Sequence, residues 1–208
     1  MDYTIFASCI GRIKSLENKM LDRAKVESLV EAKDFEDSIR LLQDTRYGTY
    51  IGSSYEEGLK SALSDLYADM YKTSPVREVV DILSVRYDGH NIKCLIKSKF
   101  AGFGPDRLLI NAGTIDPHKL KDMIFEDDLR DMPKPIRPYV EEAIEGYKST
   151  KDPQDIDITI DKGIFFYMNQ IANGSDMEYL PIIVKMLIDI TNIKSFIRIK
   201  LQDRNSQF

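Results

Sequence analysis

The sequence predicts an all-α protein, and three observations support this fold class. Apolar residues recur at spacings of three and four along nearly the whole chain, which is the period of an amphipathic helix. Alternating β-branched segments, which are typical of strands, are scarce. Residues that favour helix starts precede several of the apolar stripes, as at Asp34 and at Asp116-Pro117.

The first half of the chain predicts five helices. Ser53 and Ser54, each followed three residues later by glutamate, form overlapping capping boxes before the fourth helix. Ser74 and Pro75 predict the N-cap and the first residue of the fifth. The apolar stripes of these helices lie at residues 5–20, 26–30, 35–42, 59–70 and 79–83.

The second half repeats this pattern after a non-helical stretch at residues 100–115, which we interpret as a linker. Asn173-Gly174 predicts a helix end, because both residues tolerate the left-handed conformation. The expected helices run from Asp116-Pro117 through residue 124, over 138–147, over 155–172, and then as a pair that ends near residue 201.

Composition excludes several classes of protein. The chain has 208 residues, and 29 Lys and Arg against 34 Asp and Glu give a net charge of −5, which argues against a dedicated nucleic-acid binder. The longest uncharged run, 163–175, is shorter than the ~20 residues of a membrane-spanning helix. The first residues lack the features of a signal peptide. Two cysteines fit a reducing compartment, so we expect a cytoplasmic protein without a transmembrane segment.

An internal repeat relates the two halves at a constant offset of 101 residues. Residues 81–99 and 182–200 share seven identities, where about one is expected for average composition. The simplest interpretation is two helical units of ~100 residues, at 1–104 and 105–208. We expect the shared positions to have a structural role, and the repeat-signature residues are Asp88, Asn91, Ile92, Lys93, Asp189, Asn192, Ile193 and Lys194.

The two asparagines of this signature are unusual inside a helical pattern, because asparagine is a mediocre helix former. We hypothesise that Asn91 and Asn192 each cap a helix end and divide a long helix at the same place in both units.

The charges of the chain are unevenly distributed. Residues 86–107 carry a net charge of +3 and residues 141–161 a net charge of −5. The cations at Lys97, Lys99, Arg198 and Lys200 could simply favour helix C-termini, or they could form a basic rim that meets acidic loops of a partner or an anionic membrane. The acidic clusters, Glu126-Asp127-Asp128 and Glu141-Glu142-Glu145, are interpreted as a solvated face, with a docking surface for a basic partner as the alternative.

The sequence contains no convincing catalytic constellation. His90 could act as a metal ligand or general base, but its counterpart in the second copy is Thr191, which favours a capping or packing role. Cys9 and Cys94 are interpreted as small buried residues, and His118 as a surface residue. Gly102-Phe103-Gly104 is only a partial dinucleotide-loop motif. We therefore predict no catalytic, cofactor-binding or metal-binding residues.

Several segments, in order, give the chain its resemblance to a known family. It resembles the C subunits of archaeal and bacterial V/A-type ATPases, to which the d subunit of the eukaryotic vacuolar ATPase is related. The segments that carry the resemblance are Tyr3–Glu17, Leu41–Gly48, His90-Asn91-Ile92-Lys93, Gly113-Thr114-Ile115 and Asn192-Ile193-Lys194.

The resemblance implies an all-helical, funnel-shaped protein of three similar units, of which the third is absent from these residues. It implies a non-catalytic central-stalk subunit of an ion-translocating ATPase or ATP synthase, without cofactor, substrate or nucleic acid. Its implied partners are the rotor shaft subunits and the membrane proteolipid ring. The protein would be monomeric alone, present once per complex, and peripheral on the cytoplasmic side of the membrane.

Two other functions stay open. A helical-repeat adaptor, unrelated to ATPases, would bind other proteins in a concave face and is supported by the repeat alone. A small helical enzyme is the third hypothesis, for which the sequence supplies neither a nucleophile nor a cofactor loop.

Overall fold

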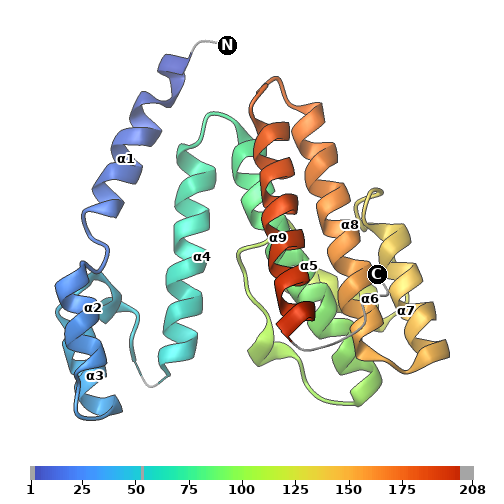
Figure 1. The fold of residues 1–208 in the computed structure, drawn as a ribbon, viewed down its shortest axis with the longest axis horizontal. Coiled ribbons are helices and arrows are strands. Elements are labelled where there is room, and N and C mark those ends of the chain that lie inside the picture. The colour runs from blue at the N-terminus through green and yellow to red at the C-terminus, as the bar shows by residue number, and fades with distance from the viewer. Residues whose placement is uncertain (1–2, 53, 202–208) are drawn as a thin grey trace.

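The computed structural model describes residues 3–52 and 54–201, and every regular element within them is a helix (Figure 1). The predicted all-α class is therefore confirmed. The α-helices are α1 (Ala7–Glu17), α2 (Arg23–Val30), α3 (Phe35–Gln43), α4 (Tyr55–Thr73), α5 (Arg77–Ala101), α6 (Pro117–Phe125), α7 (Arg137–Thr150), α8 (Pro153–Gly174) and α9 (Leu180–Leu201), and the 3-10 turns are η1 (Tyr3–Phe6), η2 (Arg46–Thr49) and η3 (Asp106–Leu108).

Most predicted helix starts are confirmed by side-chain caps. The Asp34 carboxylate accepts a hydrogen bond from the Asp37 backbone N–H at the start of α3. Asp116 accepts from two N–H groups of the first turn of α6, directly before Pro117. Ser54 accepts from the Glu57 N–H and caps α4. Each cap satisfies donors that a helix start leaves unpaired. The other predicted cap, Ser53, lies outside the described residues.

The predicted cap at Ser74-Pro75 is wrong by two residues. The Ser74 N–H donates to the Met70 carbonyl and ends α4, and the Ser74 hydroxyl donates to the Val76 carbonyl at 2.8 Å. These bonds place Ser74 at the C-terminal end of one helix, so α5 begins only at Arg77, after Val76.

The end of α8 also differs from its prediction. The helix includes Gly174 and ends with Ser175 in an extended conformation. Among the glycines that the structure describes, only Gly102 has a positive φ, of 72°, and it forms the left-handed C-cap of α5. The chain reverses there and runs back along α5, because glycine adopts this conformation without steric cost.

Helix α5 lies at the centre of the main hydrophobic core. Figure 1 shows α6, α7 and α8 grouped around it, and among the described residues the interface of α5 with α8 is the most extensive. Side chains of α5, such as Ile92 and Leu95, share one cluster with Ile160 of α8 and Val140 of α7. The core therefore crosses the predicted boundary between residues 104 and 105, and the division into two units stays a prediction.

Helices α1 to α4 form an arm beside this core (Figure 1). A small second cluster, centred on Tyr67, Val80 and Ala112, joins α4 to α5. A salt bridge of 2.9 Å between Arg12 Nε and Asp69 Oδ2 ties α1 to α4. Neither α2 nor α3 contains a buried residue, so the arm has little hydrophobic core of its own.

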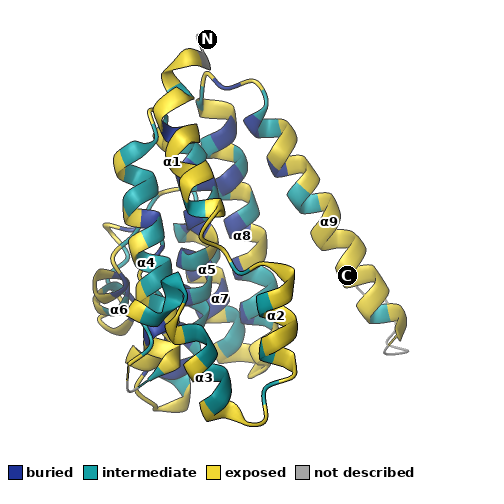
Figure 2. Cartoon of the chain, turned by 90° about the vertical axis from the view of Figure 1, so that its left-hand side faces the viewer, coloured by how far each residue is buried: buried dark blue, intermediate teal, exposed yellow. Residues whose placement is uncertain are grey.

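Helix α9 is one continuous helix rather than the predicted pair. Its first two turns enter the core through Leu180 and Val184, and the rest extends away from the bundle with most of its surface exposed (Figure 2). Within the described part of the chain, no helix combines the length and the apolar character that crossing a membrane requires.

Candidate functional site

The repeat signature of the first copy forms a polar clamp on α5. Asn91, which is fully buried, donates from Nδ2 to the Ile110 carbonyl at 2.8 Å and accepts from the Ile110 N–H at 2.9 Å. The amide thus satisfies both backbone polar groups of one residue in the segment after Gly102. The predicted division of the helix at this residue is wrong, because α5 runs unbroken through Asn91 and its amide bonds to the loop rather than to a helix end.

Asp88, one turn before Asn91, holds the next part of the same segment. Its buried carboxylate accepts hydrogen bonds from the Thr114 N–H at 2.9 Å, the Thr114 hydroxyl at 2.6 Å and the Ile115 N–H at 3.1 Å. Burial raises the pKa of Asp88 to about 6, although these three donors oppose the shift. The two residues together fix residues 110–115 along the helix.

The close approach of this loop requires a glycine. A Cβ atom on Gly113 would lie 2.1 Å from Oδ1 of Asp88, which is closer than such atoms pack. Gly89, on α5 itself, is also crowded, because a Cβ there would lie 2.6 Å from Cγ1 of Ile164 on α8. The Gly-Thr-Ile sequence at 113–115 is therefore explained by the clamp.

The cations of the first copy pair with acidic groups of the second half. Lys93 Nζ lies 2.7 Å from Asp161 Oδ1, and Lys97 Nζ lies 2.6 Å from Asp157 Oδ1, both on α8. Lys99 donates to the Ile124 carbonyl and to Asp127. The basic stretch and part of the acidic stretch thus neutralise each other across α5 and α8, so Lys97 and Lys99 are paired within the chain, which disfavours the basic rim that was one of their two interpretations.

The signature residues of the second copy are exposed, and no described segment covers them as residues 110–115 and α8 cover α5. Asp189, Asn192 and Lys194 lie on α9 and are all exposed. Ile193 is 59% exposed, whereas its counterpart Ile92 is fully buried. The structure therefore does not bring the eight signature residues together: four form the clamp region of α5 and four face outward on α9.

His90 and Cys94 form a pair that the sequence reasoning missed. Nε2 of His90 lies 3.0 Å from the Leu108 carbonyl oxygen and 3.6 Å from Sγ of Cys94. The hydrogen bond to Cys94 raises the pKa of His90. The signal was the spacing of four residues, which places both side chains on one helix face. Cys94 is half-buried rather than buried, whereas Cys9 and the exposed His118 are as predicted.

The described residues contain no group of three or more His, Cys, Asp or Glu side chains that could hold a metal ion.

The predicted acidic clusters lie partly around an open cavity of about 610 Å³. There Arg130 holds the pKa of Asp128 down to about 2 through a hydrogen bond, and Lys148 pairs with Glu145.

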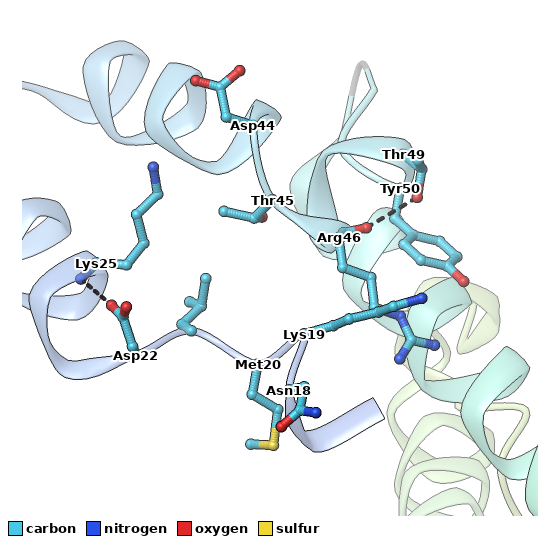
Figure 3. Close-up of a pocket in the computed structure, with 11 residues that line it drawn as sticks. Asn18, Lys19, Met20, Asp22, Lys25, Asp44, Thr45, Arg46, Thr49 and Tyr50 are labelled. Atoms are coloured by element: carbon cyan, nitrogen blue, oxygen red, sulfur yellow. Dashed lines mark hydrogen bonds between the residues drawn. The ribbon is translucent and has the colours of Figure 1, made fainter. Parts of the chain in front are cut away.

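A polar pocket on the arm has a volume of about 590 Å³ and lies between the α1–α2 connection and η2 (Figure 3). Lys19, Lys25 and Arg46 line it together with Asp22 and Asp44. Asp22 accepts from the Lys25 N–H as the N-cap of α2, so it serves the helix rather than a ligand. The pocket is open, of mixed charge, and without a built ligand site.

Comparison with known proteins relates nearly the whole chain to one family. The family model described as ATP synthase (C/AC39) subunit matches residues 9–208. The C subunit of the A-type ATP synthase of Methanocaldococcus jannaschii is 27% identical over 95% of this chain, and the C subunit of the V-type sodium ATPase of Enterococcus hirae is 27% identical over 94%. The chain spans 55% and 61%, respectively, of the lengths of these relatives.

Proposed function

Because the chain belongs to the ATP synthase (C/AC39) subunit family, we propose that it acts as a non-catalytic central-stalk component of a V/A-type ion-translocating ATPase or ATP synthase. In this role it couples the rotor shaft to the membrane proteolipid ring and performs no bond chemistry. The observation that carries the proposal is the family match over residues 9–208, together with relatives named as the C subunits of A-type and V-type enzymes.

The construction of the bundle suits transmission of torque. Close-packed protein interiors have low compressibility and transmit strain, so a rotating shaft is best coupled through a dense core. Helices α5 to α8 have such a core, and the polar clamp of Asp88 and Asn91 fixes the connecting loop 110–115 to it. These features support a rigid coupling body.

The proposal extends to the organisation and surroundings of the protein. We propose that residues 1–104 and 105–208 are two units, each ending on a signature helix, α5 or α9, and that the eight signature residues have a structural role. The protein is present once per complex, binds peripherally on the cytoplasmic side of the membrane, and requires no cofactor. The rotor shaft subunits and the proteolipid ring are its partners.

Affinity purification of the chromosomally tagged protein from gently solubilised membranes tests this function. We expect rotor shaft and proteolipid subunits to co-purify with it in a stable complex, with one copy of the tagged chain in each. An unrelated tagged cytoplasmic protein, carried through the same steps, gives the background. Recovery of the tagged protein alone in the soluble fraction would overturn the proposal and favour the helical-repeat adaptor instead.

A further inference from the structure

Helices α4 and α5 meet at a short connection, residues 74–76, and separate on leaving it (Figure 1). The direct interface of α4 with α5 is much smaller than that of α5 with α8. Figure 1 also shows the loop between α5 and α6 running beside the half of α4 that lies far from the connection. The space between the two helices is thus filled by loop residues as well as by the helices' own side chains.

Part of this loop, residues 107–115, is here called the spacer loop, because it is buried between α4 and α5. Ala112 is 2% exposed and forms one cluster with Tyr67 of α4 and Val80 of α5, so each of the three elements supplies one buried residue. Ile110 packs against the same cluster. The backbone and methyl group of Ala112 therefore set the separation of α4 from α5 at this point, since packed interiors leave few voids.

The clamp on α5 fixes the spacer loop on both sides of Ala112. Before it, Asn91 bonds to both backbone groups of Ile110, and after it, Asp88 accepts a hydrogen bond from the Thr114 N–H. Bonds on both sides hold the buried methyl group in one register against α4. The position of Ala112 is therefore determined by α5, and α4 packs on it.

The first half of α4 rests on the same loop. Lys60, in the second turn of the helix, donates from Nζ to the Arg107 carbonyl. A direct polar contact of α4 with α5 lies nearer the connection, where the Tyr71 hydroxyl donates to Asp81 Oδ1 at 2.7 Å. Of these two contacts, the one with the spacer loop is farther from the connection and so has more leverage on the angle of α4.

We propose that the spacer loop sets the angle between the arm and the bundle, and that the clamp of Asp88 and Asn91 determines whether the loop is in place. With the loop seated, α4 is held at a fixed separation from α5. With the loop released, the arm pivots about the connection at 74–76. The clamp and the arm are thus two ends of one conformational element, and this inference does not depend on the proposed function.

The rest of the arm is too loosely packed to keep this angle by itself. The bridge of Arg12 to Asp69, which ties α1 to α4, is partly exposed. Close to the connection, Phe6 and Cys9 line an apolar cavity of about 300 Å³ together with Tyr179. Close packing transmits strain, whereas a cavity of this size leaves room for the arm to move.

Distances between paired spin labels, measured by pulsed electron paramagnetic resonance, test the proposal. Labels at Glu56 on α4 and Lys162 on α8, both exposed, report the angle of the arm. Labels at Glu142 on α7 and Lys162 report the bundle alone. The background carries Cys9→Ser and Cys94→Ser, so that only the introduced cysteines are labelled, and its helix content by circular dichroism must match that of wild type.

A size series at residue 112 should change the angle in steps. Ala112→Val and then Ala112→Leu are expected to lengthen the mean distance between the α4 and α8 labels, since an overpacked site forces the backbone apart. Ala112→Gly, which removes the methyl contact, is expected to broaden the distance distribution. An unchanged distribution across the series would show that residue 112 does not set the separation, and would overturn the proposal.

Asn91→Ala tests the link from the clamp to the arm, because its bonds are to Ile110 of the spacer loop. We expect the distribution of the α4–α8 distance to broaden. Lys60→Met, which cuts the bond to the Arg107 carbonyl at an exposed site and leaves the clamp intact, is expected to have the same effect. A distribution as narrow as that of wild type in either variant would overturn the proposal.

Tyr71→Phe is the matched control, since it removes the direct bond to Asp81 and leaves the spacer loop untouched. It is expected to keep the wild-type distribution. A broadening as large as that of Asn91→Ala would show that direct bonds to α5 hold the arm, and would overturn the proposal. So would a broadening of the Glu142–Lys162 distance in Asn91→Ala, because the whole bundle, rather than the arm, would then have loosened.

Discussion

At the residue scale, Asn91 and Asn192 allow one substitution to be compared in two environments. Asn91→Ala removes both hydrogen bonds to Ile110 and leaves its backbone groups without their partner. We expect the free energy of unfolding to fall by about 2–3 kcal/mol, since an unsatisfied buried polar group costs ~1–3 kcal/mol. Asn192→Ala changes an exposed side chain and should stay within about 0.5 kcal/mol of wild type. Urea unfolding of the 208-residue chain measures both, and equal losses would contradict the clamp.

Asp88 introduces a pH dependence that an ordinary surface carboxylate would not. The pKa of Asp88 is raised from 3.8 to about 6 in the folded protein. Between about pH 4 and pH 6, its carboxyl group is therefore protonated in the folded protein and ionised in the unfolded chain. Stability therefore rises as the pH falls from about 6 to about 4, by roughly 3 kcal/mol at 1.36 kcal/mol per pKa unit, and is lost again as the pH rises.

The variant Asp88→Asn isolates this contribution, because its side chain does not titrate. As the pH falls from 6 to 4, we expect the free energy of unfolding of the wild type to rise relative to that of the variant. Denaturant unfolding at several pH values within this window measures the difference. A difference that is constant with pH would mean that Asp88 titrates as it does in the unfolded chain.

At the element scale, the ion pairs between α5 and α8 should couple the two helices weakly but measurably. Lys97 contacts both oxygens of Asp157, at 2.6 and 2.8 Å, in a partly exposed position. A double-mutant cycle with Lys97→Ala and Asp157→Ala is expected to give about 0.5–1 kcal/mol, decreasing at high salt. The exposed pair of Lys148 and Glu145 within α7 serves as the control, and its coupling should be smaller. No coupling at low salt would refute the inter-helix bridge.

The elements that the sequence predicts well are those whose signals are local. The caps at Asp34 and Asp116 act on the next turn of chain, so their position in the sequence is sufficient to predict them. Asn91 has its partner 19 residues away, and a single sequence does not show that the two meet. Its interpretation as a helix cap failed because a polar residue inside a helix can also bond to another segment.

The repeat could be read from the sequence, but the different burial of its two copies could not. Identity between residues 81–99 and 182–200 gives the same residue types at the same register. Whether those residues are buried depends on what packs against them. Helix α8 packs against α5, whereas no described element covers most of α9. Packing partners, rather than propensity, distinguish the two helices.

At the scale of the whole molecule, stability should be unevenly distributed between the arm and the main bundle. Helices α2 and α3 have no buried residue, whereas α5 has eleven. We expect amide hydrogens of α2 and α3 to exchange through local opening and those in the middle of α5 to exchange only through global unfolding. Hydrogen exchange read by mass spectrometry measures this, and equal protection of α2 and α5 would contradict the distribution.

The distances along the chain between α5 and its partners also set an order of events during synthesis. The clamp residues meet groups 19 to 27 positions later, but Lys97 and Lys93 meet α8 only 60 and 68 positions later. At about 5–20 residues per second, the ribosome needs roughly 3 to 14 seconds to supply those 60 to 68 residues. The polar side of α5 is therefore covered first. Its apolar side stays exposed, and can bind chaperones or misassemble, until α8 emerges from the ribosome.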